Sequence, residues 1–225
     1  GQEAGQPDAF PMFAAQLFTI RMHQGRLDEL AAALAAAPRR SGRSRTIPLL
    51  TQAYLATIFT EHGRDEEARA PYERLMSSDL ADAPYDFSWL AVVALGSAAA
   101  AALGDRARAP GLISMLAPYR ARYVDMGSSW LGSTAYYLGV LHACVGDLAA
   151  AEECFQDALV AEQALGGGAW IARTKLAYAR ALRDRGESED LARAAELTEE
   201  AVDSARRLGL GAVLRRAGAA QGKAE

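Results

Sequence analysis

One short signal recurs along this 225-residue chain at nearly constant intervals. A glycine followed by a charged residue occurs at Gly25, Gly63, Gly104, Gly146 and Gly186, with spacings of 38, 41, 42 and 40 residues. Each glycine lies between two apolar-rich stretches of good helix formers. Because glycine readily adopts the left-handed conformation that ends an α-helix, the pattern predicts five helix–turn–helix units with a period of about 40 residues.

The fourth copy, residues 136–159, shows how such a unit packs. Gly139 lies seven residues before the turn glycine, and Ala151, Phe155 and Ala158 lie five, nine and twelve residues after it. Small side chains at three of these positions let the two helices approach closely, and the Phe155 ring fills the space between neighbouring units. We therefore expect a tight helical hairpin here.

This phasing of small and large residues resembles the tetratricopeptide repeat (TPR). The second copy keeps the same phasing through Leu55, Ala56, Ala68 and Tyr72, and the resemblance covers residues 12–208. The period is longer than the usual TPR length of about 34 residues and approaches that of HEAT repeats, but the phasing favours the TPR class.

Three longer stretches resemble one particular group of helical-repeat proteins. FAAQLFTIRMHQGRLDELAAAL, YYLGVLHACVGD and WIARTKLAYARALRDRGE are similar to the C-terminal helical-repeat region of large actinobacterial signalling ATPases and LuxR-type transcriptional regulators. That resemblance implies a superhelix that senses a ligand or partner. The sequence contains neither a Walker lysine loop nor a recognisable helix-turn-helix, so we expect no ATPase or DNA-reading activity from these residues.

We therefore expect an all-α protein, a right-handed α-solenoid of about five TPR-like repeats over residues 12–208. A flexible segment, residues 1–11, would precede it, and a short capping helix and tail, residues 209–225, would cover the last repeat. The connector at residues 38–48 carries four arginines. We interpret it as a solvated loop, with the docking of an acidic partner or a phosphate as the alternative.

Composition limits both the class of protein and the cellular compartment that we expect. Apolar residues make up 51% of the chain and the formal net charge is −4, which excludes global disorder and argues against a dedicated nucleic-acid binder. Two cysteines, Cys144 and Cys154, and the lack of a signal-peptide pattern predict a reduced, cytoplasmic setting. No stretch is hydrophobic and long enough to span a membrane. The chain begins with Gly1, as expected of a domain cut from a longer protein.

The candidate binding surface is the concave face, which the first helix of each pair lines in a TPR superhelix. Its inward positions are mostly small or apolar, but the fifth copy carries arginines spaced i, i+7 and i+10. The candidate residues are Thr57, Thr60, Ala94, Ala98, Ser133, Tyr136, Val140, Arg173, Leu176, Arg180 and Arg183. This surface suits a protein or peptide segment, or a small molecule whose anionic end binds the arginines. Alternatively, the face packs against neighbouring helices and the arginines pair with Glu187 or Glu189.

Tryptophans form a second candidate feature. Trp89, Trp130 and Trp170 recur at spacings of 41 and 40 residues, each near the start of a repeat. They would form an aromatic edge for a partner, or, alternatively, plugs that pack the connectors between repeats.

No catalytic or metal-binding pattern stands out. His23, His62 and His142 lack the spacing of a zinc site, and no serine lies near a patterned histidine and acid, so we predict no catalytic residue, metal or cofactor. The sequence thus predicts a non-catalytic binding module, the sensor or interaction domain of a transcriptional or signalling regulator, without direct contact to nucleic acid or membrane. The alternatives are a constitutive scaffold or self-associating homo-oligomer, and an accessory enzyme that acts on an anionic substrate.

Overall fold

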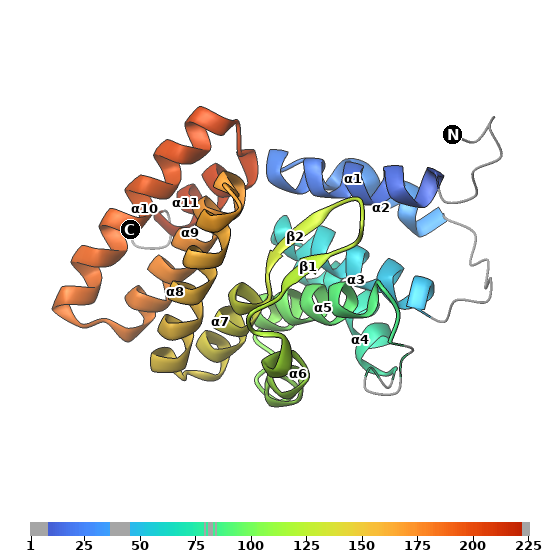
Figure 1. Cartoon of the computed structure of the whole chain (residues 1–225), viewed down its shortest axis with the longest axis horizontal. Helices are drawn as coiled ribbons and strands as arrows, with labels where there is room; N and C mark the ends of the chain where they lie inside the picture. Colours follow the sequence, from blue (N-terminus) through green and yellow to red (C-terminus); the bar gives the residue numbers. More distant parts are fainter. Residues whose placement is uncertain (1–8, 37–45, 79, 81–82, 84, 222–225) are drawn as a thin grey trace.

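The computed structural model describes residues 9–36, 46–78, 80, 83 and 85–221 (Figure 1). These residues form eleven α-helices, a 3-10 helix (Ala117–Tyr119) and one two-stranded sheet. The α-helices are α1 (Ala9–Gln24), α2 (Asp28–Ala36), α3 (Thr46–Glu61), α4 (Asp65–Met76), α5 (Trp89–Leu103), α6 (Ala109–Leu116), α7 (Thr134–Val145), α8 (Leu148–Ala164), α9 (Gly168–Arg185), α10 (Ser188–Leu208) and α11 (Gly211–Gln221). The prediction of a helical protein is confirmed, and the sheet is an addition to it.

The recurring glycines set where helices end. Helices α1, α3, α5, α7 and α9 each end within two residues of one of the five turn glycines, and the next helix begins within five residues after it. All five glycines have φ between 67° and 86°. Side chains disfavour this left-handed conformation, so glycine at these positions ends one helix and lets the chain reverse into the next.

From α2 onward, helices next to one another in sequence pack side by side. The second helix of a pair packs on the first in α3–α4, α5–α6, α7–α8 and α9–α10, and α3, α5, α7 and α9 also contact one another in succession. In the α7–α8 pair, a Cβ atom at Gly139 would lie 2.7 Å from the Phe155 ring. The close helix approach expected from this glycine is therefore present.

A β-hairpin occupies a position where the sequence indicated only a connector. Strands β1 (Tyr123–Asp125) and β2 (Trp130–Ser133) pair antiparallel, with Tyr123 opposite Ser133. The hairpin lies across α3 and α5 (Figure 1). Val124 and Leu131 are fully buried, and the Tyr54 hydroxyl of α3 donates to Met126 Sδ at 3.5 Å. The hairpin is thus part of the core.

The first and last helices meet. Helix α1 packs against α11, and its Phe18 ring lies 4.1 Å from the ring of Tyr54 in α3. Gly25 lies so close to the start of α11 that a Cβ atom there would be 2.8 Å from the backbone nitrogen of Ala212. Helix α11 therefore contacts the beginning of the chain as well as α9 and α10.

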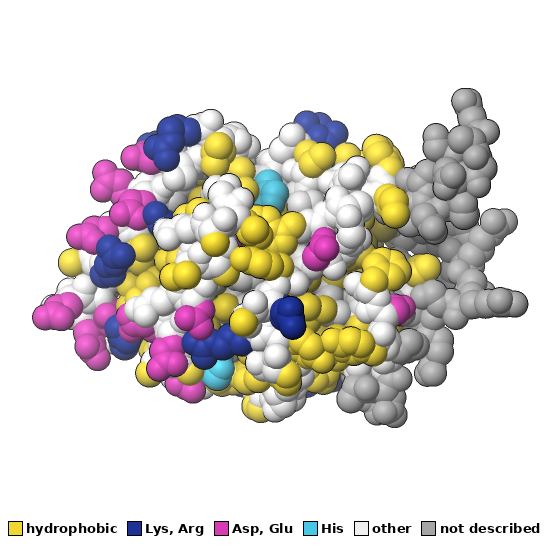
Figure 2. Space-filling model, in the orientation of Figure 1, with side chains coloured by type: hydrophobic (Ala, Val, Ile, Leu, Met, Phe, Trp, Pro, Cys, Tyr) yellow, Lys and Arg dark blue, Asp and Glu magenta, His cyan; other side chains and the backbone are white. Residues whose placement is uncertain are grey.

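The expected segment boundaries need small changes. Helix α1 begins at Ala9, inside the segment that was expected to be flexible. Residues 1–8, the arginines of the 38–48 connector and residues 222–225 lie outside the described residues. Charged side chains gather mainly over α8–α10 in Figure 2, whereas hydrophobic side chains are prominent toward the middle of this view.

Candidate functional site

The inward positions predicted from the sequence are largely covered by the chain itself. The buried members are Thr57, Ala94, Ser133, Tyr136, Arg173 and Leu176; Thr60, Ala98, Val140 and Arg183 are half-buried, and Arg180 is exposed. In this conformation, most of them contact other parts of the protein instead of solvent.

The part of this surface on α3, α5 and α7 is hydrophobic core. The hydroxyls of Thr57 and Thr60 donate to carbonyl oxygens of α3 itself, at 2.9 and 3.0 Å. Ala94 has no exposed surface, and Ala98 and Val140 pack against the main hydrophobic cluster. These positions therefore match the packing alternative in the present conformation.

The three arginines of α9 lie in different environments. Arg173 is buried, Arg180 is exposed, and Arg183 donates to the Thr198 hydroxyl of α10 at 3.2 Å. Leu176 packs in a second hydrophobic cluster built by α9, α10 and α11. The arginine spacing therefore does not produce one shared site, and Arg173 pairs with Glu61 instead of Glu187 or Glu189.

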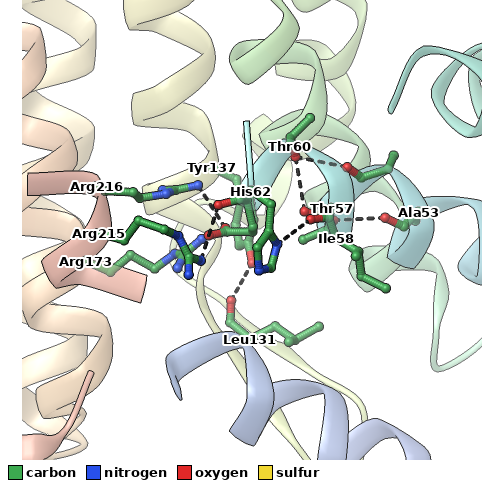
Figure 3. A network of polar contacts seen from close by, with 12 residues as sticks. Ala53, Thr57, Ile58, Thr60, His62, Leu131, Tyr137, Arg173, Arg215 and Arg216 are labelled. Carbon is green, nitrogen blue, oxygen red and sulfur yellow. Dashed lines mark hydrogen bonds and ion pairs between the residues drawn. The ribbon is translucent and has the colours of Figure 1, made fainter. Parts of the chain in front are cut away.

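Three arginines converge on the end of α3, beside His62 (Figure 3). Glu61 is the last residue of α3, and Arg173 of α9 and Arg216 of α11 both contact its Oε1 atom, the latter at 2.9 Å. Arg215 of α11 donates to the backbone oxygens of Gly25, at 2.8 Å, and of Glu61, at 3.5 Å. We call these four residues, Glu61, Arg173, Arg215 and Arg216, the Glu61–arginine cluster.

Local sequence explains why Glu61 needs cationic partners. It is the single charged residue of α3, and it lies at the helix C-terminus, where the helix dipole disfavours an anion. Only 6% of its surface is exposed, and Arg173 is 5% exposed. Burying an ionised carboxylate without a partner is costly, and the arginines of α9 and α11 compensate the charge of Glu61.

The surroundings of Arg173 shift its pKa, and Arg173 in turn helps to shift the pKa of His23. Burial lowers the pKa of Arg173 and the Arg216 guanidinium acts in the same direction, whereas contact with the Glu61 carboxylate favours the charged guanidinium. Burial, together with the charge of Arg173, lowers the pKa of His23 to about 4. His23 packs edge-on against Trp170, with ring centroids 5.6 Å apart, and is neutral at pH 7.

A second buried acid lies in the same part of the interior. Glu162 of α8 has no exposed surface and accepts hydrogen bonds from the hydroxyls of Ser133, at 3.1 Å, and Thr174, at 2.8 Å. Burial raises the pKa of Glu162 to about 7, and the two hydroxyls limit the shift. Burial likewise raises the pKa of Tyr136, with Arg216 opposing the shift and Glu162 adding to it. Arg216 and Glu162 therefore both act on the ionisation of Tyr136.

The tryptophans divide into two groups. Trp89 donates from Nε1 to the Leu80 carbonyl oxygen at 3.0 Å and packs against the rings of Tyr85 and Tyr119. Trp130 and Trp170 pack against each other, with ring centroids 6.3 Å apart. Trp89 and Trp170 are buried, and the contact of Trp89 with a connector carbonyl matches the alternative, a plug that packs a connector, instead of the aromatic edge.

A shallow hollow of about 460 Å³ lies between the end of α4 and α6. Met76, Leu80, Leu112 and Met115 contribute its apolar lining. The charged residue at its edge, Arg108, already pairs with Glu73 at 2.8 Å and with Asp105 at 2.9 Å. The hollow therefore offers hydrophobic contact beside polar groups such as Ser77 and Ser78.

Sequence reasoning located part of the polar interior and missed the rest. Ser133, Tyr136 and Arg173 were expected to face a ligand, and the structure places them around the buried acids. Glu61, Glu162, His23, Arg215 and Arg216 were missed. One available signal was Glu61 itself, a lone charge at the end of an otherwise uncharged helix.

Among the described residues, no three His, Cys, Asp or Glu side chains lie close enough together to hold a metal ion. None of the described helices has the length and apolar character needed to cross a membrane. Comparison of the chain with protein-family models, curated proteins and solved structures gave no match.

Proposed function

We propose that this chain is a non-catalytic binding module of the TPR-like α-solenoid class, the sensor or interaction domain of a transcriptional or signalling regulator. The regular succession of helix pairs, joined at left-handed glycines, supports the class. So does the packing of α3, α5, α7 and α9 against one another, because a solenoid is built by stacking such units in a row. We place its action in the cytoplasm, without membrane or nucleic acid as a partner.

The observation that carries the sensor role is the Glu61–arginine cluster. It joins α3, near the start of the array, to α9 and α11 at its end. A ligand that exchanges these ion pairs for its own contacts would change how the two ends of the array are held together. Because removing one partner of a buried ion pair typically costs about 3–5 kcal/mol, the paired and unpaired arrangements would be distinct states.

The proposed ligand is a small molecule with an anionic end, or a protein or peptide segment. The hairpin packs over α3 and α5, so a long segment binding there would have to displace it. An anion would need only to reach the arginines of α11, of which Arg215 is exposed and Arg216 half-buried.

A thermal-shift screen against metabolite and peptide libraries tests the proposal. A ligand that binds the folded chain alone raises its stability by about 2.7 kcal/mol at a hundredfold excess over Kd. We expect a stabilising ligand that also changes the small-angle X-ray scattering profile, and whose effect is lost in Arg216→Ala. The control is Arg206→Ala, which removes an exposed arginine of α10. Stabilisation without a change of shape would contradict a sensor, and no stabilising ligand would favour the scaffold.

The alternative is a constitutive scaffold or self-association domain. Met12, Phe13 and Ile20 of α1 are exposed, so the chain presents hydrophobic surface. The hollow beside α6 adds apolar side chains such as Met76 and Met115 to it. Size-exclusion chromatography with light scattering tests self-association: a mass that rises with concentration supports it, and a monomer at all concentrations contradicts it.

A further inference from the structure

The pairing inside the Glu61–arginine cluster is uneven. Arg173 and Arg216 both contact Oε1 of Glu61, whereas Oε2 is buried and has no hydrogen-bond partner among the described residues. The Nε atom of Arg173 is also buried and lacks a partner there. A guanidinium and a carboxylate can form two parallel hydrogen bonds, and in this cluster neither arginine does so with Glu61.

Positive groups also outnumber negative groups in the cluster. Two guanidinium groups contact the Glu61 carboxylate, a third, that of Arg215, contacts the backbone oxygen of the same residue, and the nearby His23 is neutral at pH 7. The hydrogen bonds of Arg215 go to two backbone oxygens, which carry no net charge. Glu61 therefore satisfies only part of the positive charge and only part of the donor capacity that converge on it.

We propose that Arg173, Arg215 and Arg216 form a binding site for the phosphate or carboxylate group of a small molecule, and that Glu61 is the internal anion which this ligand displaces. The inference rests on the proposed function and specifies its ligand and its regulation. Phosphate and carboxylate groups match the planar, multi-donor guanidinium better than chloride does.

The route of entry follows from exposure. The Arg216 side chain is 36% exposed while Arg173 is almost fully buried, so an arriving anion meets α11 first and reaches Arg173 only after Glu61 withdraws. Glu61 acts as a competitor that lowers the apparent affinity for the ligand, because the site is vacant only in the fraction of molecules in which Glu61 has moved away. Loss of its contact with Arg216 would also break the ion pair between α11 and α3, leaving the hydrogen bond from Arg215 to the Glu61 backbone oxygen.

The decisive variant is Glu61→Gln, which keeps the size of the side chain and removes its charge. Isothermal titration with inorganic phosphate and, separately, with succinate, at ionic strength held constant with sodium chloride, measures the affinity. We expect Glu61→Gln to bind at least one of these probes at least tenfold more tightly than the wild-type chain. Adding Arg216→Gln should abolish that gain. Whichever probe gains affinity identifies phosphate or carboxylate as the preferred group.

Glu162→Gln is the matched control. It neutralises another buried glutamate whose hydrogen-bond partners are hydroxyls, and it should leave the affinity for both probes unchanged. Equal affinity in wild type and Glu61→Gln, or an equal gain in Glu162→Gln, would overturn the anion site. If far-UV circular dichroism shows that Glu61→Gln does not fold, Arg216→Gln alone decides: it should weaken binding at least fivefold relative to wild type, and unchanged binding would refute the site.

Failure of this site and failure of the sensor role give different results. If neither probe binds through the arginines but the library screen yields a stabilising ligand that changes the shape, the anion site is wrong and the sensor role stands. If Glu61→Gln gains affinity but its scattering profile is the same with and without the probe, the site stands and the sensor role is wrong.

Discussion

The helix positions that the sequence predicted to face inward fall in two regions with opposite character. On α3 and α5, the inward positions pack beneath the β-hairpin, where Val124 and Leu131 are fully buried and the threonine hydroxyls bond to their own helix. Near α9 and α11, the interior contains Glu61 and Arg173, a charged pair with little exposed surface. The comparison shows that equivalent positions become core or a polar site according to what packs over them.

The largest effect is expected in the charged region. Arg173→Ala leaves Glu61 buried with fewer compensating charges and should lower the free energy of unfolding by about 3–5 kcal/mol. Urea denaturation measures the change. Arg180→Ala, on the exposed surface of the same helix, should stay within about 0.5 kcal/mol of wild type. Similar losses in both variants would mean that the buried pair has no special role.

The hydrophobic region should respond to loss of volume. Leu131→Ala removes a fully buried side chain from the hairpin and should destabilise the protein by about 2–5 kcal/mol in the same measurement. Leu165→Ala, at an exposed position after α8, is the control and should have little effect. A loss at Leu131 no larger than that at Leu165 would contradict the assignment of the hairpin to the core.

A smaller, pH-dependent effect is expected at Glu162. Its pKa of about 7 in the folded chain exceeds the usual value of 4.5, so the folded state binds more protons between these values. Stability should therefore fall as pH rises from about 4.5 to about 7, by about 2–3 kcal/mol from this group.

Glu162→Gln should flatten that part of the stability profile, which chemical denaturation at a series of pH values records. Glu153→Gln, an exposed glutamate of the same helix, is the control and should keep the wild-type slope. If Glu162→Gln retained the full slope, another group would be responsible for it.

Helix positions and close contacts within one pair were predictable because they depend on neighbours in the sequence. The turn glycines mark the helix ends through their left-handed conformation, and Gly139 lies against Phe155 as the phasing of the fourth copy indicated. The hairpin at residues 123–133 was not predicted, because its strands are only three and four residues long and their pattern is too short to recognise.

The candidate site depended on contacts between distant segments. Arg173 was identified from its helix face, but its partner lies 112 residues away in the sequence, and no local pattern links the two. Arg215 and Arg216 were assigned to a capping helix, and only the meeting of α1 with α11 brings them to the end of α3.

By itself, the sequence determined the helical class and the places where the chain turns, because glycine conformation and helical periodicity act over a few residues. Only the tertiary structure decided what packs over α3 and α5 and which charges meet near α9 and α11. Burial makes an unpaired charge costly, so Glu61 had to find cationic partners, but which arginines could reach it depended on how the ends of the chain pack together.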